Sequence, residues 1–349
     1  MAGTIREMLE DLEERTLHPR AARSAASRGR ARPEEPDDER PAFQRDRDRL
    51  LHSKAFRRLA GKTQVFLAPR GDHYRTRLTH TLEVAQVGRS VARALRLNEM
   101  LVEAMVMGHD LGHTPFGHAG ERLLAEVVPG GFHHVVQSVR VVEVLENDGS
   151  GLNLTAEVRD GILRHSKGRG DVLLTGTGEK ALTLEAEIVR IADIVAYVNH
   201  DLDDAVRAGL FAETDVPREI RQALGDARGH RFRALVQDVI RHSDLDGGGH
   251  IEMSREVHDA LLGLREFLYA RVYENPVVHD EFVKAQRILR DLWTWCVEDP
   301  ARLAERHGIA PRPGETAERA VTDWLSGMTD RFALATWESL FVPRPWGLV

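Results

Sequence analysis

Apolar residues recur at the three- and four-residue spacing of an α-helix along almost the whole of this chain of 349 residues. Residues 77–96 show the pattern clearly, with a stripe made of Leu78, Leu82, Ala85, Val91 and Leu95. The same spacing predicts further helices over residues 4–17, 43–60, 98–110, 119–128, 133–147, 153–165, 183–208, 254–274, 277–296 and 315–340. Convincing alternating strands are few, and no internal repeat stands out. The sequence therefore predicts an all-α, multi-helix fold.

Residues 19–42 are an exception to this pattern. The segment is rich in arginine, alanine, serine, proline and acidic residues, and it has few large apolar side chains. Such a composition buries too little apolar surface to offset the entropy that is lost when a chain becomes ordered. We therefore expect a mobile or disordered link after the first helix.

Two glycine-rich segments have some features of binding loops, but neither has the required spacing. Residues 166–180 contain Gly-Thr-Gly-Glu-Lys, which lacks the G-x-x-x-x-G-K-[ST] pattern of a phosphate-binding P-loop. Residues 244–249 begin like a calcium loop but place Gly248 where a third ligand should be. We expect the first segment to be a loop or small hairpin and the second to be a turn.

Composition excludes several classes of protein. The net charge of −7 and the pI of about 6.2 give no global basic field that would indicate a nucleic-acid partner. Cys296 is the single cysteine, which excludes a disulfide framework and a thiolate zinc site. The sequence shows neither a signal peptide nor an apolar run of membrane-spanning length, so we expect a soluble, cytoplasmic protein without a membrane partner.

Side chains of metal-ligand type lie in three separate predicted helices. They are His80, the adjacent pair His109 and Asp110, and Asp193. Carboxylate oxygens favour Mg²⁺ or Mn²⁺, whereas imidazole suits transition metals such as Mn, Fe, Co or Ni. Four protein ligands leave an octahedral ion two open positions, enough for an attacking water and a substrate phosphate oxygen. Together the four residues predict one site for a divalent metal ion.

Asp193 taken alone has a second interpretation. It lies at the edge of an apolar helical stripe made of Ile188, Ile191, Val195 and Val198. A carboxylate in such a place needs a cation, because burying it unpaired is costly. That cation could be a metal ion, or it could be an arginine such as Arg190 or Arg159.

A second group of polar residues follows the His-Asp pair. His118 and Glu121 are three residues apart on a predicted helix, so they share a face and Glu121 could hold the imidazole. A histidine held in this way suits a general acid that protonates a leaving oxygen, although the pair could also be a simple helix cap. His113 and His134 are candidates for phosphate contact or water positioning, with ordinary polar packing as the alternative, and we expect His133 to be a bystander.

These motifs are similar to those of the HD-domain phosphohydrolases, and specifically of the deoxynucleoside triphosphate triphosphohydrolases, the dGTPase-like family. The similarity runs from about residue 40 to residue 295. It is carried by RDRDRLLHS (45–53), FRRLAGKTQVF (56–66), RTRLTHT (75–81), the run 109–121, GGFHH (130–134), RHS (164–166) and RIADIVAYVNHD (190–201). The resemblance implies an N-terminal helix and flexible arm (1–42), an HD-domain catalytic core (43–295) and a helical C-terminal extension (296–349).

The resemblance also implies a role for each candidate residue. It assigns the metal to His80, His109, Asp110 and Asp193. It makes His118 and Glu121 the catalytic dyad, and it places His113 and His134 next to the phosphates of the substrate. The substrate-binding residues that it implies are Gln64, Arg77, Tyr197, Asp201, Arg265 and Tyr273. Of these, the two arginines would contact the triphosphate, Tyr273 would stack below the sugar, and the others would line the deoxyribose. Some relatives have a lysine directly after the metal aspartate, where this chain has Ile194.

The reaction that the resemblance implies is water attack at the α-phosphorus of a deoxynucleoside triphosphate, with dGTP as one candidate for the preferred substrate. The products would be the deoxynucleoside and tripolyphosphate, and the cofactor would be Mn, Mg or Co, with Fe or Ni as further candidates. Relatives often form dimers to hexamers and bind nucleotides as allosteric effectors. Two alternatives stay open: another HD-domain phosphohydrolase, such as a nucleotidase or phosphodiesterase, and a regulatory module that binds nucleotide or single-stranded DNA without turnover.

Overall fold

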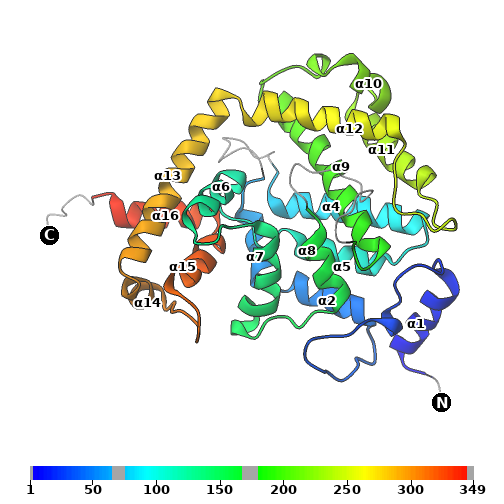
Figure 1. Cartoon of the computed structure of the whole chain (residues 1–349), viewed down its shortest axis with the longest axis horizontal. Coiled ribbons are helices and arrows are strands. Elements are labelled where there is room, and N and C mark those ends of the chain that lie inside the picture. Colours follow the sequence, from blue (N-terminus) through cyan, green and yellow to red (C-terminus); the bar gives the residue numbers. More distant parts are fainter. Residues whose placement is uncertain (1–2, 65–74, 167–179, 344–349) are drawn as a thin grey trace, which may run out of the picture.

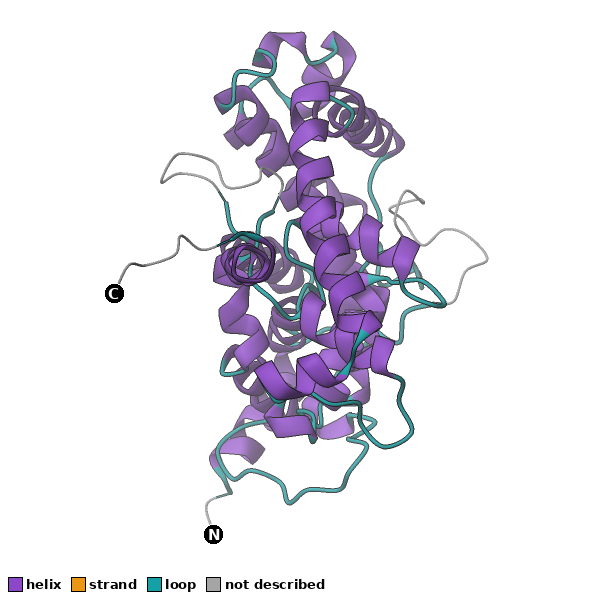
Figure 2. Ribbon diagram, turned by 90° about the vertical axis from the view of Figure 1, so that its left-hand side faces the viewer, coloured by secondary structure: helices purple, strands orange, loops and turns teal. Residues whose placement is uncertain are grey.

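The computed structural model describes residues 3–64, 75–166 and 180–343, and these residues form an all-α protein (Figure 1). The described residues contain no strand, only two isolated antiparallel bridges, Arg30 with Thr155 and Thr63 with Thr76 (Figure 2). In chain order the α-helices are α1 (Ile5–Thr16), α2 (Ala42–Leu51), α3 (Lys54–Arg58), α4 (Arg77–Ala94), α5 (Glu99–His109), α6 (Gly117–Val127), α7 (His134–Arg140), α8 (Ala156–Arg164), α9 (Leu184–Arg207), α10 (Arg218–Leu224), α11 (Arg228–His242), α12 (Arg255–Leu268), α13 (Pro276–Glu298), α14 (Ala301–His307), α15 (Ala317–Ser326) and α16 (Asp330–Phe341). The predicted fold class is confirmed.

The centre of the molecule is built around α5. This helix is apolar on nearly every side, and α2, α4, α8 and α9 all pack against it. A helix that is apolar all round can be stable only when it is covered on all sides. The burial of α5 fixes the position of its C-terminal end, where His109 is the last helical residue and Asp110 is the cap.

A second apolar cluster lies at the C-terminal side of the molecule, where α13 packs against α6, α15 and α16 (Figure 1). Leu123 and Leu124 of α6 are buried in it together with Leu289 of α13 and Leu325 of α15. One side of α6 is therefore fixed by the C-terminal helices. The predicted start of the C-terminal extension at residue 296 falls inside α13.

Residues 19–42 differ from the expected mobile link, because they lie against the helical core through polar contacts. The Ala22 N–H donates to Glu185 (2.9 Å), and the Ser27 hydroxyl donates to Glu157 (2.8 Å). Arg30 forms an ion pair with the fully buried Asp46. The composition of the segment gave no sign of these contacts, because the acidic partners lie elsewhere in the chain.

Several predicted helices are shorter or divided. The stretch 315–340 forms two helices, α15 and α16, and 43–60 is divided after α2. The stretches 133–147 and 254–274 each end in a π-helical turn, Val141–Leu145 and Tyr269–Tyr273. Helices α10, α11 and α14 were not predicted.

The two glycine-rich segments differ in what the structure describes. Residues 244–249 form the expected turn, whereas residues 167–179 of the predicted loop lie outside the described residues. No helix in the described part of the chain combines the length and the hydropathy needed to cross a bilayer.

Candidate metal centre and active site

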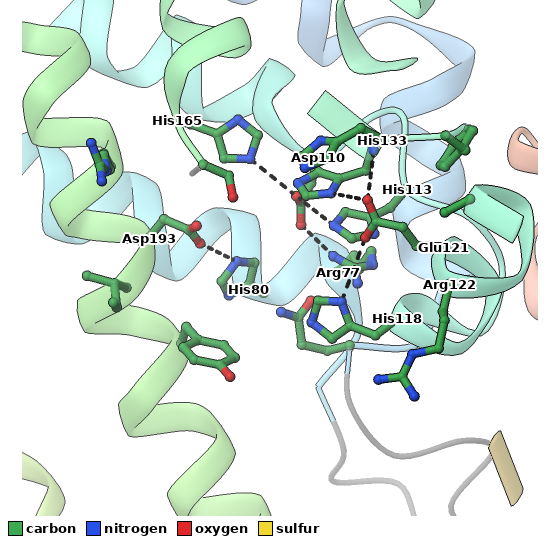
Figure 3. Close-up of a pocket in the computed structure, with 18 of the residues that line it drawn as sticks. Arg77, His80, Asp110, His113, His118, Glu121, Arg122, His133, His165 and Asp193 are labelled. Carbon is green, nitrogen blue, oxygen red and sulfur yellow. Dashed lines mark hydrogen bonds and ion pairs between the residues drawn. The ribbon is translucent and has the colours of Figure 1, made fainter. Parts of the chain in front are cut away.

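A cavity of about 420 Å³ opens between α4, α6, α7, α9 and α12. Eleven of the predicted site residues line it: Gln64, Arg77, His80, Asp110, His113, His118, Glu121, His134, Asp193, Tyr197 and Arg265. Figure 3 shows the side chains of α4, α6 and α9 converging on this space. Residues that are up to 201 positions apart in the sequence, from Gln64 to Arg265, thus share one site.

The predicted metal ligands lie together at one end of the cavity. The ligand atoms of His80, His109 and Asp110 all lie within 4.8 Å of one another, and all three residues are buried. Asp193 Oδ1 lies 3.1 Å from His80 Nε2 and 3.9 Å from His109 Nε2. The partner of Asp193 is therefore this histidine pair rather than Arg159, which forms an ion pair with Glu143.

The chemistry of His109 fits a metal ion. Its Nδ1 lies 2.6 Å from the Val106 carbonyl, so Nδ1 carries the proton and Nε2 presents a lone pair. This Nε2 is buried and has no hydrogen-bond partner. Such an unpaired acceptor is costly unless it ligates a cation. The second ring nitrogen bound to a backbone carbonyl is typical of a metal-ligating histidine.

The carboxylates of the group are held in the ionised state that a metal ion needs. Burial raises the pKa of Asp193, but the hydrogen bond from His80 and the nearby His109 and His165 together outweigh burial, and the pKa lies below its usual value. Asp110 is also buried, yet His109, His113 and Arg77 keep its pKa well below the usual range. Both side chains are therefore available as anionic ligands at neutral pH.

The backbone after α5 brings Asp110 and His113 to the same wall of the cavity. Gly112 packs so closely on α7 that a Cβ atom there would lie 2.2 Å from the Ser138 nitrogen. His113 Nε2 lies 3.4 Å from Asp110 Oδ1, and the His113 ring stacks on His134 at 4.0 Å. Burial and the nearby Arg77 lower the pKa of His113 well below its usual value, so this ring is neutral.

Glu121 has a different main partner from the one that its spacing predicted. It accepts hydrogen bonds from the backbone N–H of His134 (2.9 Å) and from His134 Nδ1 (2.7 Å), whereas His118 Nδ1 lies 3.8 Å away. Burial raises the pKa of Glu121, but the two histidines outweigh this and hold the pKa well below its usual value. An ionised carboxylate has no proton to donate, so His134 Nδ1 is the donor. His118 is 47% exposed and lies on the cavity wall.

Arg77 contacts a candidate metal ligand directly. Its Nη1 donates to Asp110 Oδ2 at 2.7 Å, and only 2% of its surface is exposed. The predicted contact with the triphosphate would therefore be made by a side chain that is already fixed by Asp110.

The predicted sugar-binding residues lie further along α9, but not all of them face the cavity. Tyr197 lines it, and its ring stacks parallel to Tyr273 with 6.4 Å between centroids. Tyr273 donates a hydrogen bond to Asp201 Oδ2, and neither residue is on the cavity wall. Asp201 Oδ1 is buried without a partner, and burial raises the pKa of this carboxyl to about 7. The structure thus places Asp201 behind the tyrosine pair.

Two histidines to which the sequence analysis gave no role also belong to the site. His165 follows α8 and donates from Nδ1 to the Ile162 carbonyl (2.8 Å), so its Nε2 lone pair faces Asp110 at 4.0 Å. Burial lowers the pKa of His165 to about 3. His200 Nδ1 lies 3.4 Å from His80 Nδ1, and its other ring nitrogen contacts Glu83. His80 is thereby held between Asp193 and His200.

Family comparisons agree with this geometry. The HD domain matches residues 77–198, and the phosphohydrolase-associated domain matches residues 251–339. The all-α core and the buried His–Asp group therefore define a phosphohydrolase of the HD class.

Curated relatives extend the match to nearly the whole chain. Deoxyguanosinetriphosphate triphosphohydrolase-like proteins are 51% identical in Caldanaerobacter subterraneus (98% of this chain, 97% of the relative), 50% in Desulfatibacillum aliphaticivorans (98% and 99%) and 44% in Clostridium perfringens SM101 (97% and 98%). The chain belongs to the deoxyguanosinetriphosphate triphosphohydrolase-like family.

Proposed function

We propose that this hydrolase cleaves deoxynucleoside triphosphates at the α-phosphorus and releases the deoxynucleoside and tripolyphosphate. The observation that carries the proposal is that a buried group of candidate metal ligands shares a cavity with His118, an exposed histidine 3.8 Å from Glu121. The names of the curated relatives support a nucleoside triphosphate as the substrate class.

His80, His109, Asp110 and Asp193 would hold the divalent ion. When bound, such an ion neutralises charge on a phosphate and lowers the pKa of a water molecule. Four arginines line the cavity, namely Arg77, Arg122, Arg190 and Arg265, and of these Arg77 and Arg265 would hold the remaining phosphates. His113 is neutral and would contact a phosphate oxygen as a hydrogen-bonding group rather than as a charge.

His118 would protonate the departing 5′-oxygen. An alkoxide is a poor leaving group and needs a proton, whereas a polyphosphate leaves readily without one. An accessible histidine next to the ionised Glu121 suits cleavage at the α-phosphorus. Tyr197, backed by Tyr273, would form the wall against the sugar and leave no room for a 2′-hydroxyl.

Product analysis tests the proposal. The purified protein would be incubated with each dNTP singly, with mixtures of dNTPs and with ATP, each with Mg²⁺, Mn²⁺ or Co²⁺, and the products separated by ion exchange. We expect deoxynucleoside and tripolyphosphate, with dATP cleaved faster than ATP. Release of inorganic phosphate would instead support a different HD-domain phosphohydrolase, and binding without turnover would support a regulatory module.

A further inference from the structure

The turn between α15 and α16 packs against two segments that carry residues of the active-site cavity. This α15–α16 turn comprises residues 326–330 and lies in the phosphohydrolase-associated domain. It contacts two segments of the cavity wall: residues 62–64, which end at Gln64, and residues 113–118, which end at His118. The two segments are 49 positions apart in the sequence, counted from Gln64 to His113.

Asp330 is the residue that both segments share. Its Oδ2 accepts hydrogen bonds from the Thr63 N–H (3.0 Å) and the Thr63 hydroxyl, and its Oδ1 accepts one from the Phe116 N–H (2.9 Å). One carboxylate thus fixes the backbone one residue before Gln64 and two residues before His118. Asp330 is partly buried and does not line the cavity, so it acts only through these neighbours.

Phe116 needs such support because its backbone is in the left-handed region. Its φ is +62°, and Gly117 follows with a φ of +55°. A residue with a side chain adopts this conformation only when its surroundings compensate the steric cost. These two residues set the direction in which α6 begins, and His118 is the second residue of that helix. The orientation of His118 therefore depends on the hydrogen bond to Asp330.

Lys62 makes a second connection between the same parts. Its Nζ is buried and donates to the His113 carbonyl and to the Ser326 carbonyl (2.8 Å). The Lys62 carbonyl in turn accepts from the Arg77 N–H (3.2 Å). Gly117 packs against the first segment, because a Cβ atom on it would lie 3.2 Å from the Gln64 carbonyl oxygen. These contacts hold the two segments together, and the α15–α16 turn packs against both of them.

We propose that Asp330 is a positioning residue of the active site: it holds Gln64 and His118 in register through the two segments. This inference rests on the proposed function for the roles of those two residues. It gives the phosphohydrolase-associated domain a task in catalysis, namely to orient His118, which the HD domain carries, and Gln64, which precedes that domain.

The test compares Asp330→Ala with Asp291→Ala as a matched control. Asp291 accepts from the Trp337 indole (2.8 Å) and joins α13 to α16, but it contacts neither segment. Hydrogen exchange would be followed in peptides covering residues 60–64 and 113–118, together with kcat, KM and metal content. We expect Asp330→Ala to exchange at least about tenfold faster in both peptides and to lose kcat by about tenfold or more, with unchanged metal content. We expect Asp291→Ala to behave like the wild type in these peptides.

Thr63→Val separates the contact of Asp330 with Thr63 from its contact with Phe116. This change removes one hydroxyl and leaves the Phe116 contact in place, so we expect KM to rise more than kcat falls. A uniform loss of stability could not produce that split. If Asp330→Ala fails to fold, Asp330→Asn replaces it: one carboxylate oxygen becomes an NH₂ group, and at least one of the two segments loses its acceptor and exchanges faster.

The outcomes are distinct. Wild-type exchange in both segments of the Asp330 variants, or equal losses in Asp291→Ala, would overturn the positioning role. A wild-type protein that cleaves no deoxynucleoside triphosphate would overturn the proposed function, while the exchange data would still decide whether Asp330 holds the two segments.

Discussion

The Glu121 carboxylate accepts two hydrogen bonds from one residue, His134, through its backbone N–H and its Nδ1. His134 is the first residue of α7, so this contact joins the starts of α6 and α7. His118 lies further from the same carboxylate and keeps its ring partly in solvent. The geometry separates a fixed pair, Glu121 with His134, from an accessible histidine that can meet a substrate.

The first prediction concerns that accessible histidine. His118→Ala should lower kcat by about 10²–10⁴-fold, the range for a positioned general acid, with unchanged metal content. Glu121→Gln should lower kcat less, because Glu121 influences the proton donor without being one. Steady-state kinetics and metal analysis of both variants check this. Loss of the metal in His118→Ala would make His118 a ligand and contradict the assignment.

The second prediction concerns the metal group. Asp110→Ala and His109→Ala should both lose the bound metal and all turnover while circular dichroism shows the helices intact. Each change removes a ligand from a buried group whose remaining members cannot enclose an octahedral ion. His133→Ala is the control, since His133 lies at the cavity but belongs to no group with His80 or His109. Metal retained in Asp110→Ala would show that the ion binds elsewhere.

The third prediction uses the raised pKa of Asp201, which is about 7 in the folded protein against an ordinary value near 4. The folded state therefore holds a proton that the unfolded state has lost between about pH 4 and pH 7, and stability from this group falls as pH rises through that window. Asp201→Asn removes the titration. The difference in unfolding free energy between variant and wild type should grow in favour of the variant from pH 4 to pH 8, by up to about 4 kcal/mol. Urea titrations at the two pH values measure it, and parallel pH profiles would contradict it.

The fourth prediction concerns the close contact after the His-Asp pair. Gly112→Ala should destabilise the protein by about 3 kcal/mol or more, because the new Cβ would collide with backbone atoms of α7 that cannot move aside. Gly229→Ala is the matched control: it lies near the start of α11 with open space around it, so it should be neutral or slightly stabilising. Thermal unfolding of both variants checks this, and equal melting temperatures would be the contrary result.

The fold class and the grouping of the candidate metal ligands could be predicted because both follow from local signals in the sequence. Helical spacing is a property of neighbouring residues, and His109 with Asp110 at a helix end already limits where an ion can lie. The roles of His165 and His200 could not be predicted in this way. His165 follows α8 and His200 lies in α9, and each becomes part of the site only when these helices pack beside α5 and α4.

The partner of Glu121 shows the same limit on a smaller scale. Spacing along one helix favoured His118, but a loop brings His134 closer from 13 positions away. Residues 19–42 were expected to be mobile for a related reason. Their order depends on buried acids such as Glu185 and Glu157, and a single segment contains no information about partners more than 100 positions distant.

Helix α9 carries Asp193 at the metal end and both Tyr197 and Asp201 toward the other end, at intervals of four residues. With a rise of about 1.5 Å per residue, the first and last of these lie about 12 Å apart along the axis. The helix packs against α4, α5, α8, α11 and α12, so this spacing cannot stretch. On the proposed function, α9 sets the distance between the metal ion at the α-phosphate and the tyrosine wall at the sugar. A single residue inserted between Asp193 and Tyr197 would rotate the tyrosine by about 100° around the helix axis. The sugar wall would then no longer lie opposite the substrate whose phosphate the metal ion holds.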